Sequence, residues 1–109
     1  LGDVYKRQIV FCTPLYWYSF STQMKAAIDK FYSFIIGKKE LPVKECMLLS
    51  CGELEGPHVF DGMVRSFELI AQDRGWKDRG HYLVNSVSEK GAILNTNHLQ
   101  KVYDMGKGF

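Results

Sequence analysis

The chain reads IVFCTPLYWY at residues 9–18 and SFSTQMKAAIDK at residues 19–30. The first residues form a short apolar run, which is typical of a strand buried on both faces of a parallel sheet. A loop opened by proline and rich in aromatic residues follows, and then a stretch in which Ser21 or Thr22 can cap a helix. In open α/β sheets, ligands bind outside the carboxyl ends of the strands. The aromatic residues therefore stand where a ligand would bind.

This order of strand, loop and helix is repeated along the chain. The first helix is indicated by Met24, Ile28, Phe31 and Ile35, which recur at helical spacing before Gly37. The expected elements are a strand over 9–13, a helix from Ser21 or Thr22 to Gly37, a strand over 45–51, a helix over 59–74 ended by Gly75, a strand over 81–87 and a helix from 95 or 96 to 105 ended by Gly106. Strands that alternate with helices predict a parallel sheet.

Length and composition favour a single globular domain of 109 residues, 46% hydrophobic and 24% charged. A net charge of +2, without a basic cluster interleaved with aromatic residues, gives no reason to expect a nucleic-acid partner. No apolar run approaches the roughly 18 residues of a membrane span, and we expect no membrane association. The expected location is the cytoplasm.

Cysteine and histidine residues give no metal-binding pattern. Cys12, Cys46 and Cys51 are odd in number and lack C-x-x-C spacing, so we expect free thiols used for packing in a reducing compartment. The histidines share no ligand spacing with each other or with the cysteines. No metal site is predicted.

The first eight residues lack the cap, turn or periodicity that would lead into the strand. We expect residues 1–8 to be a non-native or disordered leader and the natural N-terminus to be missing. Three strands are also few for a sheet of this class, and a first strand as apolar as residues 9–13 would be a poor sheet edge.

Several motifs resemble those of the flavodoxin-like NAD(P)H-dependent FMN reductases. They occur in the family's order, at about its spacing, over roughly residues 9–107. These motifs are Thr13-Pro14-Leu15-Tyr16-Trp17, Gln23-Met24-Lys25 with Ile28-Asp29-Lys30, Ser50-Cys51-Gly52, Arg74-Gly75-Trp76 and Met105-Gly106-Lys107.

The resemblance implies an α/β fold with a flavodoxin-like open parallel sheet, strand order 2-1-3-4-5 and flanking helices. By this resemblance the chain holds only the strand 3-4-5 portion, so residues 9–109 are the C-terminal part of the domain. The loop after the first strand, which holds the FMN phosphate at a helix N-terminus, is then absent. We therefore expect half of a flavin site.

The remaining half of the site would be formed by two loops. By resemblance, Tyr16, Trp17 and Tyr18 are candidates for stacking on the flavin ring, with backbone N–H groups from Leu15 to Ser19 at its edges. Alternatively, one or two of these rings pack on the neighbouring helix or on a dimer partner. Gly52 either lets the backbone approach the ring or simply ends the strand. The full candidate set for binding the cofactor is Thr13, Pro14, Leu15, Tyr16, Trp17, Tyr18, Ser19, Cys51, Gly52 and Glu53.

The function implied by the resemblance is an FMN-dependent NAD(P)H oxidoreductase that passes electrons to a small-molecule acceptor, such as free flavin or a quinone. We assign no catalytic residue, because the cofactor carries the bond changes. The complete protein is expected to be a homodimer. The alternatives are an electron-transfer protein like flavodoxin, which is usually more acidic, and an inactive fragment. For the chain as it stands, we expect weak FMN binding or none.

Overall fold

The computed structural model describes residues 7–39 and 42–109. Of the expected leader, residues 1–6 lie outside this part. Gln8, the last residue of that expected leader, begins the first strand and pairs with Glu45. The backbone carbonyl of Arg7 also accepts hydrogen bonds from the N–H groups of Lys44 and Glu45. The ordered sheet therefore begins one residue earlier than the sequence predicts.

Three parallel strands form the sheet, in the order β1 (Gln8–Pro14), β2 (Glu45–Cys51) and β3 (Lys77–Val84). In the expected strand order 2-1-3-4-5, strands 3, 4 and 5 are neighbours, and β1, β2 and β3 have the same arrangement. The register pairs Phe11 with Leu48 and Thr13 with Ser50, so these side chains share one face. The prediction of a parallel α/β sheet is confirmed.

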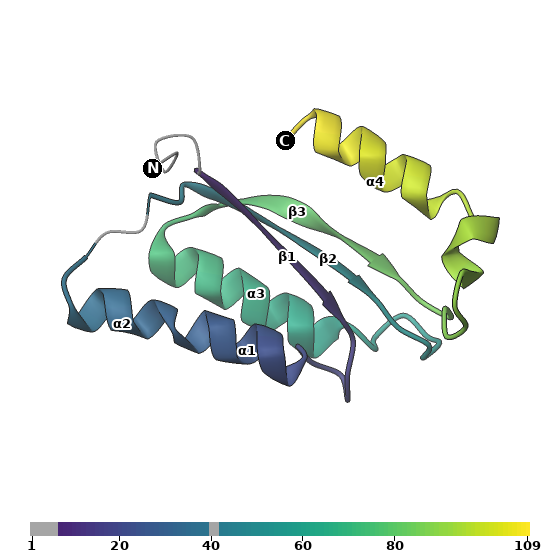
Figure 1. Ribbon diagram of the computed structural model, residues 1–109, viewed down its shortest axis with the longest axis horizontal. Helices are drawn as coiled ribbons and strands as arrows, with labels where there is room; N and C mark the ends of the chain where they lie inside the picture. Colours follow the sequence, from purple (N-terminus) through teal and green to yellow (C-terminus); the bar gives the residue numbers. More distant parts are fainter. Residues whose placement is uncertain (1–6, 40–41) are drawn as a thin grey trace.

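The helices cover the two faces of the sheet unequally (Figure 1). On one side lie α1 (Thr22–Asp29), α2 (Phe31–Ile36) and α3 (Asp61–Arg74). On the opposite side runs α4 (His98–Lys107), preceded by the 3-10 helix η2 (Ala92–Asn95). None of the helices in the described ranges is long and apolar enough to cross a membrane.

The core lies between the sheet and the layer of three helices. Phe67, Leu48, Met63 and Cys46 are its most completely buried side chains. Aromatic rings fill the space beside them, with the centroids of Phe11 and Phe67 6.0 Å apart in an edge-to-face pair. Phe31 and Trp76 form a second edge-to-face pair at 5.7 Å, an arrangement that ring quadrupoles favour.

Other element boundaries also differ from the prediction, since α3 begins at Asp61 rather than at 59 and α4 begins at His98 rather than at 95 or 96. Lys30 divides the first helix into α1 and α2, although its own backbone stays right-handed at φ −62° and ψ −24°. The third strand occupies 77–84 rather than 81–87, because pairing with β2 recruits polar residues that composition alone disfavours. Gly106 does not end the last helix, which continues to Lys107.

Within the described sheet, β1 is an edge strand that pairs with β2, and one of its faces is exposed. Its even-numbered residues face away from the core, and Val10 is 42% exposed. Cys12 is also exposed.

Candidate functional site

The aromatic loop after β1 closes as a tight two-residue turn. The N–H of Tyr16 donates to the carbonyl of Ser19 at 3.1 Å, and the N–H of Ser19 donates back to the carbonyl of Tyr16 at 3.0 Å. The two central residues, Trp17 and Tyr18, have φ values of 49° and 69°. Positive φ at both central positions defines a type I′ turn, which normally takes Asn-Gly or a similar pair.

Two consecutive bulky aromatic residues in the left-handed region are unfavourable. Each strained residue costs about 1–3 kcal/mol, and such residues cluster at functional sites. The turn also holds Trp17 almost entirely in solvent, with 92% of its surface exposed, and leaves Tyr16 and Tyr18 more than half exposed. Neither backbone preference nor burial explains this arrangement, so the turn is a candidate ligand-binding element.

Both ends of the loop are firmly held. Leu15 is buried, and its N–H donates to the carbonyl of Cys51 at 2.8 Å, which joins the loop to the end of β2. Beyond the turn, the Ser21 hydroxyl accepts a hydrogen bond from the N–H of Met24 and so caps α1. The Thr13 hydroxyl lies 3.3 Å from both the hydroxyl and the N–H of Ser21. The segments on both sides of the aromatic turn are thus fixed by hydrogen bonds.

The loops that follow β2 and β3 meet the aromatic loop that follows β1. The N–H of Gly52 donates to the carbonyl of Val84 at 3.0 Å, and the carbonyl of Gly52 accepts from the N–H of Val87 at 3.0 Å. A Cβ atom at Gly52 would stand 3.0 Å from the Cβ of Leu15. Gly52 is therefore required for the close packing of the two loops, which is a third role beside the two considered from the sequence.

These loops border an open cavity of about 670 Å³ at the carboxyl edge of the sheet, a volume in the usual range for small-molecule sites. Hereafter it is called the aromatic cavity. Its lining consists of Pro14, Leu15, Tyr16, Trp17, Tyr18, Cys51, Gly52, Glu53, Leu54, Val87 and Ser88.

Eight of the ten candidate residues line this cavity, and two do not. Thr13 is 4% exposed and faces the core, where its hydroxyl supports the cap of α1. Ser19 contributes the backbone that closes the turn. Leu54, Val87 and Ser88 also line the cavity, although they were not among the predicted residues. Val87 and Ser88 could have been found from the rule that all three strands end at the same edge, but the predicted third strand extended through Val87.

Fewer backbone donors are available than the sequence suggested. The N–H groups of Leu15, Tyr16 and Ser19 already donate to carbonyls within the chain. In the described residues, the N–H groups of Trp17 and Tyr18 have no such partner. Two adjacent donors at the tip of the turn can therefore meet acceptor atoms on the edge of a bound ring.

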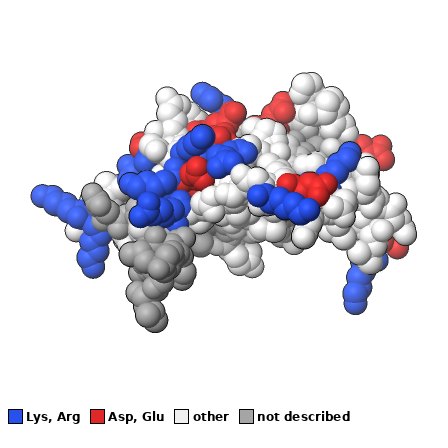
Figure 2. Space-filling model, turned by 90° about the horizontal axis from the view of Figure 1, so that it is seen from above, with Lys and Arg blue, Asp and Glu red and all other residues white. Residues whose placement is uncertain are grey.

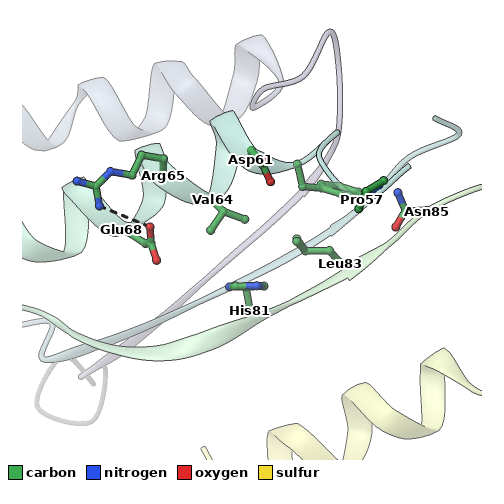
Figure 3. Close-up of a pocket in the computed structure, with 9 residues that line it drawn as sticks. Pro57, Asp61, Val64, Arg65, Glu68, His81, Leu83 and Asn85 are labelled. Carbon is green, nitrogen blue, oxygen red and sulfur yellow. Dashed lines mark ion pairs between the residues drawn. The ribbon is translucent and has the colours of Figure 1, made fainter. Parts of the chain in front are cut away.

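Another hollow, of about 460 Å³, lies between α3 and β3 (Figure 3). Its charged side chains include Arg65 and Glu68, whose nearest nitrogen and oxygen atoms lie 3.6 Å apart and partly neutralise each other. Phe60 lines it but is only 4% exposed, so it offers little surface for stacking. This hollow lacks the exposed aromatic wall that distinguishes the aromatic cavity.

Sheet topology, helix layers and the position of the cavity together define a flavodoxin-like α/β fold. A search of solved structures supports this assignment. The Trp repressor binding protein from Bacillus subtilis is similar, with a TM-score of 0.74 over 98% of this chain and 76% of that chain, at 20% sequence identity. No family model matches the chain, and no curated protein matches it. The likeness therefore establishes the fold.

Proposed function

We propose that the aromatic cavity binds the flavin ring of FMN and that the protein is an NAD(P)H-dependent oxidoreductase. The observation that carries this proposal is the strained turn that presents Trp17 and Tyr18 at the carboxyl edge of a flavodoxin-like sheet. When bound, FMN would supply hydride and electron transfer between NAD(P)H and a small acceptor.

The residues present suit an isoalloxazine ring. Trp17 offers an exposed indole face, and the centroid of Tyr18 lies 6.3 Å from that of Trp17 at an interplanar angle of 67°. A flat ring stacked on one of these side chains would meet the edge of the other. The N–H groups of Trp17 and Tyr18 can donate to ring oxygen and nitrogen atoms. The chain's own part is thus to bind and orient the ring.

A titration with lumiflavin, which is the flavin ring without ribityl phosphate, tests this proposal directly. Because lumiflavin needs only the ring-binding half of the site, we expect weak but saturable quenching of its fluorescence by the wild-type chain. Trp17→Ala should weaken binding about 5- to 150-fold, because stacking on an aromatic side chain contributes about 1–3 kcal/mol. Trp17→Phe should retain part of the affinity.

Tyr32→Ala is the matched control, since it removes a ring that is 63% exposed on α2, outside the aromatic cavity. It should bind lumiflavin like the wild type. If quenching does not saturate, or if Trp17→Ala and Tyr32→Ala behave alike, the flavin ring does not bind at this turn.

A further inference from the structure

We propose that Glu53 makes the aromatic cavity selective for planar rings that carry positive charge, such as pyridinium rings, over rings with an anionic substituent. This inference rests on the proposed function, since it concerns the ring that would lie in the same cavity. It names the chemical class of that second ligand and the residue that selects it.

The formal charge in the described lining of the aromatic cavity is negative. Among its described residues, Glu53 is the only side chain with a formal charge at neutral pH. In the described part of the chain, the Glu53 carboxylate has neither a hydrogen bond nor an ion pair. The carboxylate of this exposed residue therefore has no described cation paired with it and is available to a ring that enters the cavity.

The aromatic side chains act in the same direction. The face of an aromatic ring is negative and attracts cations, and indole is the strongest of the protein rings in this respect. Trp17, Tyr16 and Tyr18 all present exposed surface to this cavity. A positively charged flat ring would gain from both the aromatic faces and the carboxylate, whereas an anionic ring would be repelled by both.

Basic side chains lie mainly elsewhere. In the view of Figure 2, Lys and Arg are most numerous at the left, at the end of the molecule where the strands begin, and a smaller number lie over the right half. At that end, Lys44 directly precedes β2, and Lys77 and Arg79 lie in the first three residues of β3. Near the cavity, Lys90 follows Ser88 by two residues but is not part of the lining. The cavity is thus negative within a chain whose net charge is +2.

Three nearly isosteric probes separate charge from shape: 1-methylnicotinamide is cationic, nicotinamide is neutral and nicotinate is anionic at neutral pH. Binding is followed through the NMR shift of the Trp17 indole N–H. We expect the cation to bind about 5-fold more tightly than the neutral ring, and the neutral ring about 5-fold more tightly than the anion. The net positive charge of the chain would favour the opposite order.

Separate substitutions of Glu53 and Glu55 show which carboxylate causes the preference for the cationic ring. Glu53→Gln should reduce the affinity ratio of cation to anion at least 5-fold. Glu55→Gln removes the same charge from the same loop, at a residue outside the cavity lining, and should leave that ratio within about 2-fold of wild type. A wild-type chain that binds nicotinate as tightly as 1-methylnicotinamide, or an unchanged ratio in Glu53→Gln, overturns the inference.

The lumiflavin titration decides the proposed function separately. Lumiflavin binding at Trp17 without the charge order contradicts the role of Glu53 alone. Failure of lumiflavin to bind contradicts the proposed function, while the charge order of the pyridine series still decides whether Glu53 selects cationic rings.

Discussion

Leu15 and Gly52 approach each other so closely that a Cβ atom at Gly52 would stand 3.0 Å from the Cβ of Leu15 and 3.4 Å from its Cδ2. This contact joins the loops that follow β1 and β2. Leu15 is itself held by the hydrogen bond from its N–H to the carbonyl of Cys51, so it has little freedom to retreat. The shape of the aromatic cavity therefore depends on a residue without a side chain.

Gly52→Ala should consequently destabilise the protein by about 1–3 kcal/mol, the usual cost of forcing an extra methyl group into a packed site. Gly106→Ala is the control, because a Cβ at Gly106 meets nothing within 4 Å and the residue lies inside α4. It should stabilise the protein by about 0.5–1 kcal/mol. Urea unfolding of both variants measures the difference, and equal midpoints would contradict the packing role.

Replacing the strained residues Trp17 and Tyr18 should make the protein more stable and abolish its binding of the flavin ring. The double variant Trp17→Asn with Tyr18→Gly places a favoured type I′ pair at the two positions of positive φ. Relief of backbone strain should raise the free energy of unfolding by about 1–3 kcal/mol. The same change removes the exposed rings, so lumiflavin binding should be lost.

Thermal unfolding and the lumiflavin titration are measured on the same samples of this double variant. A variant that is no more stable than wild type would show that the turn is not strained. A variant that still binds lumiflavin with wild-type affinity would show that the two rings do not form the binding wall.

Much of the architecture can be predicted from local signals. Continuous apolar runs identify β1 and β2, and Gly75, which has a left-handed φ of 70°, ends α3 where expected. The meeting of the loops at 14–18 and 51–53 follows from the rule that parallel strands end at one edge. These features depend on neighbouring residues in sequence or on general topology.

The features that could not be predicted from the sequence depend on tertiary contacts. A strand that is apolar throughout has no alternation, so the sequence could not show that Thr13 faces the core while Pro14 lines the cavity. The positive φ values of Trp17 and Tyr18 oppose the preferences of those residue types. The turn becomes evident only from the structure, through these φ values and the hydrogen bonds between Tyr16 and Ser19.

The cysteines should differ sharply in reactivity. Cys46 has no exposed surface, and its burial, with a smaller contribution from Asp78, raises the pKa of the thiol from 9.0 to about 11. A thiolate is the reactive form, so this shift alone lowers the reactive fraction about 100-fold near pH 8. Cys12 is exposed. Iodoacetamide should modify Cys12 first and Cys46 only on unfolding, as peptide mass spectrometry would show. Modification of Cys46 at the rate of Cys12 in the folded protein would contradict its burial.

Glu45 connects all three strands at the opposite end of the sheet. Its carboxylate accepts a hydrogen bond from the Gln8 side chain at 2.9 Å and two from one guanidinium nitrogen of Arg79 at 3.1 Å. The hydrogen bond from Gln8, followed by the interactions with Arg79, lowers the pKa of Glu45 below its usual value of 4.5. A depressed carboxyl pKa stabilises the folded state above the unfolded-state pKa, and this contribution is lost as the pH falls through the folded-state value.

The melting temperature of wild type should therefore exceed that of Glu45→Gln near pH 6–7, and the gap should narrow as the pH falls below the ordinary pKa of 4.5 and through the lower pKa of the folded state. Glu89→Gln is a control for the loss of one negative charge, because Glu89 lies outside the strands that Glu45 joins. Melting curves at several pH values test the prediction. A gap between wild type and Glu45→Gln that stays constant from pH 7 to pH 3 would mean that the ionised carboxylate does not stabilise the sheet, and that any loss in the variant comes from packing.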